Sequence, residues 1–339
     1  MLAFVRNRWF LISLVVLITS GLYIGKAGSD ELVESLTSAF EPPVTTSIVA
    51  VVLFLMAFSL DNHQLRQSLR SPGPVIWATL LNYGLIPVLG WALMSVQHSP
   101  DFKIGLMIAA SVPCTMAAAS VWTRKAGGND AVSLLVTVLT NGTCFLLTPL
   151  WLRMATAQSV SLDAGDMVAR LMWSVLVPTL LGQAARLVPA LASLATRHKT
   201  PIGVVAQCCI LTLVFSAACK AGTQFNGAAA QTATLGGVLL VWASCVALHL
   251  AAMMIGVFGA RRFGFDRADL IAVAFAGSQK TLPIGLLLAT DASMYGNPDL
   301  LGPGLGVPFA VFPMLMFHAS QLFIDTAVAD RMAANPAVE

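Results

Sequence analysis

The stretch Ala268–Asp291, ADLIAVAFAGSQKTLPIGLLLATD, carries a single charged residue, Lys280, between Asp269 and Asp291. About 20 apolar residues, each rising 1.5 Å, are enough to cross the ~30 Å hydrocarbon core of a bilayer as a helix. Lys280 would then lie ~16 Å from either end of the helix, too far for its side chain to reach water. The lysine therefore requires a polar pocket inside the protein, at the middle of a membrane.

The neighbours of Lys280 supply polar groups for such a pocket. Ser278, Gln279 and Thr281 flank it in the sequence. Pro283 has no backbone N–H, so a helix through this position leaves one carbonyl without its usual donor. We therefore expect the function to depend on this short polar segment.

The composition of the whole chain agrees with a membrane protein. Charged residues make up 10% of the chain, against about 25% in soluble domains, and hydrophobic residues make up 57%. The sequence predicts an all-α polytopic membrane protein, with residues 1–339 forming a single integral membrane unit. The ten predicted transmembrane stretches are 8–25, 44–60, 73–96, 104–123, 131–152, 168–190, 201–222, 233–258, 269–291 and 303–327.

The distribution of Lys and Arg over the connections predicts the orientation. With ten crossings and both termini cytoplasmic, thirteen basic residues lie on the inner side, five lie on the outer side, and Lys280 lies between them. The inner residues are Arg6, Arg8, Arg66, Arg70, Arg124, Lys125, Arg186, Arg197, Lys199, Arg261, Arg262, Arg267 and Arg331. The outer residues are Lys26, Lys103, Arg153, Arg170 and Lys220. We predict a multi-pass protein of a bacterial inner membrane, and the net charge of +3 gives no case for nucleic-acid binding.

Polar residues and prolines recur at the depth of Lys280 in three other predicted helices. Pro113 and Thr115 are central in the fourth helix, Asn141 is central in the fifth, and Asn82 and Pro87 straddle the middle of the third. Such residues leave polar groups that lipid cannot satisfy. Their common depth predicts a shared polar cavity.

The fourth and ninth predicted helices each have a proline and hydroxyl side chains near the centre, so both are expected to be broken there. Their positions in the chain indicate an internal repeat. The fourth helix is the fourth of the first five, and the ninth helix is the fourth of the second five. Because five is odd, two consecutive five-helix halves (about 8–153 and about 168–327) must have opposite orientations in the bilayer. Inverted repeats with broken helices at corresponding positions are typical of secondary transporters with a site at the midplane.

Three motifs resemble a known family. GGNDAVSLLVT (Gly127 to Thr137) with the preceding SVWT (Ser120 to Thr123), NYGLIP (Asn82 to Pro87) and GSQKTLPIG (Gly277 to Gly285) occur in the order seen in the bile acid–sodium symporter superfamily. The third motif looks most like the lysine-containing ninth helix of the divergent, SBF-like branch of that superfamily, which is related to solute carrier family 10. The resemblance runs through nearly the whole chain.

The resemblance implies a fold and an ion site. It implies ten helices, a core domain in which broken helices four and nine cross, and a panel domain of four helices that moves against it, the two domains interleaved in the sequence. It also implies a transporter and not an enzyme. Carried over residue by residue, Ser120, Ser133 and Thr137 fall on positions that hold a sodium ion, the only ion or cofactor that the resemblance suggests.

The sequence departs from the family pattern at the sodium site. The relatives' sodium-binding glutamate aligns with Phe275, and Ala119 replaces a hydroxyl of the site. We expect no carboxylate near the membrane centre, while Lys280 adds a positive charge that would repel a sodium ion nearby. Coupling to sodium and coupling to protons both remain open.

The sequence thus favours a secondary active transporter of a small organic anion, in which Lys280 replaces the coupling cation or holds the substrate's carboxylate. The alternatives are a cation–proton exchanger in which Lys280 releases its proton, and a membrane receptor or enzyme, for which no constellation of residues is evident. Lys280 could also merely brace the helix crossing. Nothing implies an oligomer. The predicted substrate and coupling site comprises Lys280, Gln279, Ser278, Thr281, Thr115, Asn82 and Asn141.

Overall fold

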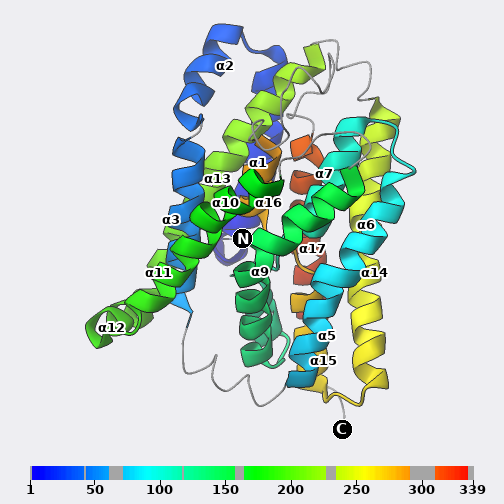
Figure 1. Cartoon of the computed structure of the whole chain (residues 1–339). Helices are drawn as coiled ribbons and strands as arrows, with labels where there is room; N and C mark the ends of the chain where they lie inside the picture. Colours follow the sequence, from blue (N-terminus) through cyan, green and yellow to red (C-terminus); the bar gives the residue numbers. More distant parts are fainter. Residues whose placement is uncertain are drawn as a thin grey trace.

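The computed structural model describes residues 2–41, 43–60, 72–116, 118–156, 164–226, 234–290 and 310–334, and every element in these ranges is helical (Figure 1). Arg66, Arg70 and Asp291, used above for orientation and depth, lie outside them, as does the predicted start of the tenth stretch. The longer helices are α1 (Leu2–Ala27), α3 (Val44–Ser59), α9 (Asp130–Thr156), α13 (Lys199–Thr223), α14 (Leu235–Arg262) and α17 (Val311–Ala334). The other predicted transmembrane stretches are divided into shorter helices. Two of them contain a π-helical turn: α5 (Pro72–Leu80), η2 (Leu81–Leu85) and α6 (Ile86–Met94), and α10 (Ala164–Leu171), η3 (Met172–Leu176) and α11 (Val177–Ala185). Two are separated by a short break: α7 (Pro100–Ser111) and α8 (Ala118–Lys125), and α15 (Arg267–Ser278) and α16 (Leu282–Thr290). The connections add α2 (Asp30–Thr37), η1 (Ser38–Phe40), α12 (Pro189–Arg197) and η4 (Gln224–Asn226).

The helices have the length and apolarity of a polytopic membrane protein. Within the described ranges, eight helices qualify as membrane spans, or nine if the bent pair Asp30–Phe40 and Val44–Ser59 counts as one span. The prediction of an all-α membrane protein is therefore confirmed. The fourth predicted helix, which is divided into α7 and α8, is not among these spans.

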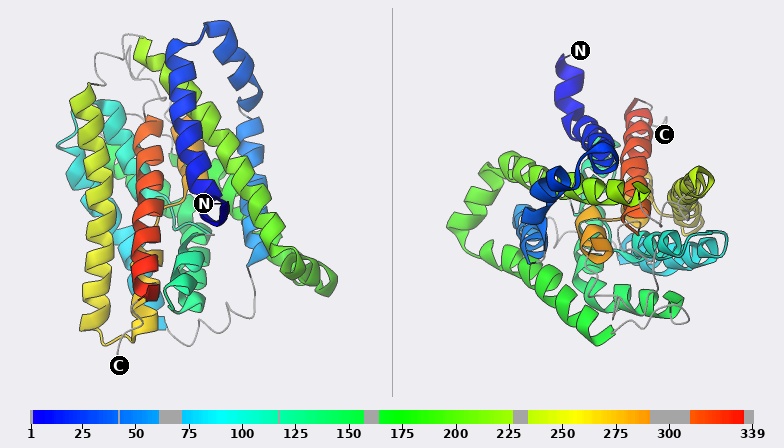
Figure 2. Two further views of the ribbon diagram at one scale, coloured as in Figure 1. Left: turned by 180° about the vertical axis from the view of Figure 1, so that it is seen from behind. Right: turned by 90° about the horizontal axis from the view of Figure 1, so that it is seen from above.

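The helices form two packed groups (Figures 1 and 2). The α1 group consists of α1, α3, α11 and α13, which pack chiefly on one another. The α15 group consists of α5 to α9 and α14 to α17, with α15 and α16 near its middle. Burial reflects this arrangement. In the most apolar stretch of α15–α16, 94% of the residues are buried, whereas in that of α1 the share is 22%. The segment that contains Lys280 is thus the most enclosed span of the described molecule.

Small residues hold the α1 group together. A Cβ atom on Gly25 of α1 would lie 2.8 Å from the Cα of Gly222 on α13, and one on Gly222 would lie 2.5 Å from the carbonyl oxygen of Leu22. Such close backbone approach is the usual way in which helices associate in membranes, where lipid offers no hydrophobic drive between them.

Two interrupted helices meet at the centre of the α15 group. α7 ends at Ser111 and α8 begins at Ala118, while α15 ends at Ser278 and α16 begins at Leu282. The backbone N–H of Thr281 in the second break donates to the carbonyl oxygen of Pro113 in the first, at 2.8 Å. Both breaks predicted from Pro113 and Pro283 are therefore confirmed, and they contact each other.

The predicted polar interruption of the third helix has a different form. α5 and α6 are continuous through η2, a π-helical turn that contains Asn82. Pro87 lies in the first turn of α6, where its missing N–H costs little beside a π-turn. Asn82 thus projects from a bulge in a continuous helix, as π-bulges often do at functional sites.

Ion pairs and a backbone hydrogen bond bring segments far apart in the sequence together at one end of the molecule. Asp330 near the end of α17 forms ion pairs with Arg8 of α1 and Lys125 of α8. The backbone N–H of Asn129 donates to the carbonyl oxygen of Ala268 at 2.9 Å. The turns that follow α8 and α14 therefore lie at the same end as Arg8 and the C-terminal end of α17. We call this the Arg8 end.

Candidate functional site

The ammonium of Lys280 is enclosed by oxygen atoms. Lys280 is fully buried, and its Nζ donates to the carbonyl oxygen of Asn82 at 2.6 Å, to Asn82 Oδ1 at 3.0 Å and to the carbonyl oxygen of Val112 at 2.9 Å. A lysine ammonium has three N–H donors, so all three are satisfied. The ring of Tyr83 lies 5.5 Å from Nζ and adds a cation–π contact. We call these oxygens the Lys280 cradle.

The cradle is built from the irregular parts of three helices. The π-turn brings forward the side chain and carbonyl of Asn82, and the α7–α8 break frees the carbonyl of Val112. The amide nitrogen of Asn82 in turn donates to the carbonyl oxygen of Gln279 at 2.9 Å. Backbone irregularities that would be costly against lipid are tolerated here because each freed group has a partner.

Gln321 of α17 closes the α15–α16 break from the opposite side. Its Oε1 accepts from the backbone N–H of Lys280 at 2.9 Å, and its Nε2 donates to the carbonyl oxygen of Lys280 at 2.7 Å. Nε2 also lies 2.8 Å from His318 Nδ1. A single amide thus replaces both backbone partners that the interrupted helix lacks at Lys280.

A carboxylate lies at the break, contrary to the expectation from the sequence. Asp325 of α17 is fully buried, accepts from Gln279 Nε2 at 2.5 Å, and lies 2.9 Å from His249 Nε2. The other ring nitrogen of His249 lies 3.3 Å from the carbonyl oxygen of Ser278. The central charge of Lys280 is therefore accompanied by an acidic group on a neighbouring helix.

The spacing of these α17 residues is recognisable in the sequence, but the tenth helix was predicted to end too early for Asp325 to count as a central residue. His318, Gln321 and Asp325 are spaced by three and four residues, which places them on one helix face. The predicted helix ends at residue 327, so Asp325 looked terminal, whereas α17 continues to Ala334. Nine further residues place Asp325 ~14 Å inside that end.

The other predicted site residues lie around the same breaks. Asn141 Nδ2 donates to the carbonyl oxygens of Cys114 and Thr137, each at 2.8 Å. Thr281 contributes its backbone N–H to the contact between the breaks, and the hydroxyl of Ser278 donates to Ala274 within its own helix at 2.7 Å. Asn141 Oδ1 and Gln279 Oε1 are buried without a hydrogen-bond partner in the described structure.

The hydroxyls predicted to hold sodium lie on facing sides of α8 and α9. Ser120 donates to Asp130, a carboxylate outside the predicted site. Ser133 lies 2.7 Å from the hydroxyl of Thr123, and the hydroxyl of Thr137 donates to the carbonyl oxygen of Ser133 at 2.8 Å. Phe275, which stands in place of the relatives' glutamate, is buried in a hydrophobic cluster that also includes Met253, Ile271 and Ala274. The oxygen donors expected for a hard cation are thus present only in part.

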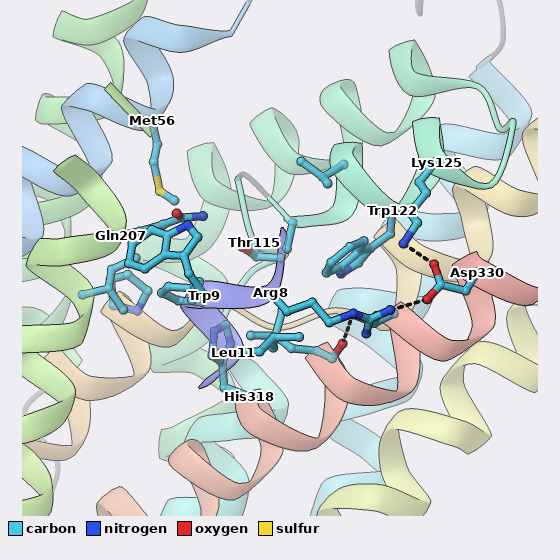
Figure 3. A pocket seen from close by; sticks show the side chains of 17 residues that line it. Arg8, Trp9, Leu11, Met56, Thr115, Trp122, Lys125, Gln207, His318 and Asp330 are labelled. Carbon is cyan, nitrogen blue, oxygen red and sulfur yellow. Dashed lines mark hydrogen bonds and ion pairs between the residues drawn. The ribbon is translucent and has the colours of Figure 1, made fainter. Parts of the chain in front are cut away.

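A cavity of about 510 Å³ lies between the α1 group and the α15 group (Figure 3). Thr115, Pro283 and His318 line it at the level of the breaks, and Arg8, Lys125 and Asp330 line it at the Arg8 end. Between these levels the wall is mainly apolar. Its apolar members are Trp9, Phe10, Leu11, Met56, Ala118, Val121, Trp122, Ile210 and Leu322.

Of the seven residues predicted for the substrate and coupling site, Thr115 is the one that lines this cavity. Lys280 does not line it, because its ammonium faces Asn82 and Val112 inside the α15 group. The cavity has its own cations, since Arg8 and Lys125 both contact Asp330 at the Arg8 end (Figure 3). Its size is typical of a small-molecule site.

Comparisons with known proteins agree with this architecture. The SBF-like CPA transporter family matches residues 8–334. The candidate symporter YfeH of Escherichia coli K12 is 26% identical over 85% of this chain and 83% of its own length. Sodium/bile acid cotransporter 7 of Danio rerio is 23% identical over 97% of this chain and 94% of its own. The protein of the same name from Rattus norvegicus is 23% identical over 96% and 92%.

Proposed function

The chain belongs to the SBF-like CPA transporter family, and from this premise we propose that it is a secondary active transporter of a small organic anion, coupled to sodium or protons, with Lys280 as a tethered cation. The family is one of transporters, and the resemblance to the bile acid–sodium symporter superfamily stated from the motifs is confirmed. The Lys280 cradle is the observation that carries the proposal.

The cradle has the composition of a cation site. Three oxygen atoms, two of them backbone carbonyls, surround Nζ at 2.6 to 3.0 Å. Oxygen ligands from irregular backbone are what transporters use for coupling cations at the midplane. A covalently attached ammonium in such a position supplies the charge of an ion without having to be bound and released. Because Nζ faces away from the cavity, this geometry favours the role of a replaced cation over direct contact with the substrate.

The proposed molecular plan follows the two helix groups. The α1 group corresponds to a panel domain and the α15 group to a core domain, within ten crossings arranged as inverted repeats of about 8–153 and 168–327. Movement of one group against the other would open the intervening cavity to alternate sides of the membrane. The Arg8 end carries the basic residues predicted to be cytoplasmic, in a bacterial inner membrane.

The cavity supports an anionic substrate with an apolar body. Arg8 and Lys125 offer positive charge at one end, and aromatic and aliphatic side chains form most of the remaining wall. Asp330 contacts both cations, so an incoming carboxylate or sulfonate would replace it there. Relatives named as sodium/bile acid cotransporters make taurocholate a suitable first probe.

The test is uptake by purified protein in proteoliposomes. Taurocholate, benzoate and succinate would be offered under an inward sodium gradient, an inward proton gradient, or neither. We expect one gradient to drive uptake of at least one anion. Uptake of none of the three under any gradient would contradict the proposal.

The variant Lys280→Gln separates coupling from bracing. A coupling role predicts a folded protein that no longer concentrates the anion, whereas bracing alone predicts lower stability with normal gradient-driven uptake by the folded fraction. Lys103→Gln removes a lysine from the start of α7 and is the matched control. It should keep both stability and uptake.

A further inference from the structure

His249 and Asp325 form a buried pair that the proposed role of Lys280 does not use. Both side chains are fully buried, and Asp325 Oδ1 lies 2.9 Å from His249 Nε2. The second ring nitrogen, Nδ1, lies 3.3 Å from the carbonyl oxygen of Ser278. Phe317 covers the imidazole in an edge-to-face contact, with ring centroids 5.9 Å apart.

The surroundings of the imidazole determine how many protons the pair holds. A neutral histidine has one N–H donor and one acceptor nitrogen. Here the carbonyl of Ser278 can only accept, and an ionised Asp325 can only accept, so both ring nitrogens must carry hydrogen for both contacts to be hydrogen bonds. If Asp325 instead carries the proton and donates it to Nε2, the total number of protons is the same. The geometry is therefore that of a loaded pair, which carries one proton more than a neutral histidine beside an ionised aspartate.

Loss of that proton would leave two acceptors facing each other at one of the two contacts. Either Nε2 would face the carboxylate or Nδ1 would face the Ser278 carbonyl, each with a lone pair. A buried polar group without a partner is costly, so deprotonation would shift the imidazole or the carboxylate.

A side-chain hydrogen bond joins this pair to the α15–α16 break. Asp325 accepts from Gln279 Nε2 at 2.5 Å, while Gln279 Oε1 has no hydrogen-bond partner in the described structure. Among the described residues, Asp325 is therefore the one hydrogen-bond partner of the Gln279 side chain. Its backbone carbonyl accepts from Asn82, which also binds the ammonium of Lys280. A change at Asp325 would thus reach the Lys280 cradle through one residue.

We propose that the His249–Asp325 pair is the proton-binding site that couples transport to the proton gradient, with Gln279 as the link to the Lys280 cradle. The coupling role rests on the proposed transport function, whereas proton binding by the pair does not. The loaded pair holds the α15–α16 break in the arrangement described, and proton release loosens it.

The other titratable groups that the structure describes near the pair have hydrogen bonds or ring contacts of their own that do not involve Asp325. Lys280 lies at the break with its ammonium in the cradle, and Tyr83 of η2 stacks on that ammonium. His318 of α17 contacts Gln321, and Cys114 lies in the α7–α8 break, close enough to interact electrostatically with both Lys280 and Asp325. None of these four donates to or accepts from Asp325 in the hydrogen bonds of the described residues.

The direct test is nuclear magnetic resonance of the purified wild-type protein with nitrogen-15-labelled histidine rings. The chain has five histidines, and His98 and His198 are exposed. Across pH 5.5 to 9 we expect one ring to show, over part of the range, both nitrogens in the signature of a loaded pair, either protonated or strongly hydrogen-bonded, and to disappear in His249→Gln. The variants His98→Gln and His198→Gln identify the two exposed rings. If every other ring has the spectrum of a neutral, unpaired imidazole throughout the range, the proposal is wrong.

The second test is the dependence of thermal stability on pH between 5.5 and 9. The loaded pair stabilises the fold, so the wild-type melting temperature should fall as pH rises through proton release. Asp325→Asn and His249→Gln should remove this fall, and the exposed control His98→Gln should keep it. An unchanged pH profile in both pair variants, or a flat wild-type profile, would overturn the proposal. If neither variant folds, the wild-type ring spectrum decides.

These measurements use no substrate. Failure of anion uptake with a loaded pair would refute the transport proposal alone, while uptake with a neutral, unpaired His249 would refute the proton site alone.

Discussion

At the scale of single residues, Asn82 is the residue on which the central charge depends. It accepts from Lys280 through both its side chain and its carbonyl, and its amide donates to Gln279. Asn82→Ala should remove one acceptor from a buried ammonium, and hydrogen bonds to charged groups contribute about 1.5–3 kcal/mol. We expect a loss of stability in that range, measured by reversible unfolding in mixed micelles.

A double-mutant cycle tests whether this loss comes from the lysine. Asn82→Ala and Lys280→Met should show a coupling energy of about 0.5–3 kcal/mol, as residues in one network do. Thr179→Ala is the control partner, because its hydroxyl donates to the carbonyl oxygen of Val175, four residues earlier in the adjoining η3, at 2.7 Å and lies in the α1 group. Strictly additive effects of Asn82→Ala and Lys280→Met would contradict the cradle.

The sequence was sufficient to predict the charged centre and its partner Asn82, but not the other partners. Lys280 and Asn82 stand out because polar residues at mid-membrane depth are rare and costly. Val112 gave no such signal, because it contributes a backbone carbonyl that every residue possesses. Asp325 required the end of α17 to be known within a turn, and helix ends are poorly determined where apolar and polar residues alternate near an interface.

At the scale of helices, the α1–α13 contact makes a prediction about glycine. Gly222 and Gly203 lie on the same helix, α13, but a Cβ on Gly222 would meet backbone at 2.5 Å, whereas one on Gly203 would meet nothing within 4 Å. Gly222→Ala should therefore destabilise the protein by about 1–3 kcal/mol through overpacking.

Gly203→Ala is the matched comparison, and it should be neutral or stabilise α13 by about 0.5–1 kcal/mol because alanine favours the helix. Melting temperatures of the two variants beside wild type provide the measurement. Equal effects of the two substitutions would show that α1 and α13 are not in close contact.

Breaks in helices were predictable where proline and polar residues coincide, as at Pro113 and Pro283. The interruption of the third helix was only partly predictable. Asn82 and Pro87 indicated a polar irregularity, yet the chain accommodates both with a π-turn and no loss of helical direction. That outcome depends on packing against α15 and α9, which local sequence does not specify. The short helices α2 and α12 were not predicted.

At the scale of the whole molecule, the cavity makes Thr115 accessible from one side. Thr115 lines the cavity near the breaks, and the Arg8 end of the cavity carries partly exposed Arg8, Lys125 and Asp330. In a cysteine-free background, Thr115→Cys should react with a membrane-impermeant thiosulfonate faster in inverted vesicles than in right-side-out ones.

Asn141→Cys is the control for this labelling, because Asn141 is fully buried and does not line the cavity. It should react slowly from both sides. Faster labelling of Thr115→Cys in right-side-out vesicles would reverse the predicted orientation, and equal labelling from both sides would argue against a cavity open at the Arg8 end.

The pairing of opposite charges inside one helix group has an electrical consequence. A single charge carried across a membrane potential of 100 mV gains or loses about 2.3 kcal/mol. Lys280 and Asp325 belong to the same α15 group, joined through Gln279 and Gln321, so a rigid movement of that group displaces both signs together. When His249 and Asp325 share one proton, however, the buried assembly carries one net positive charge, and after release it carries none. The voltage across the membrane would then act on only one of the two crossings in each cycle.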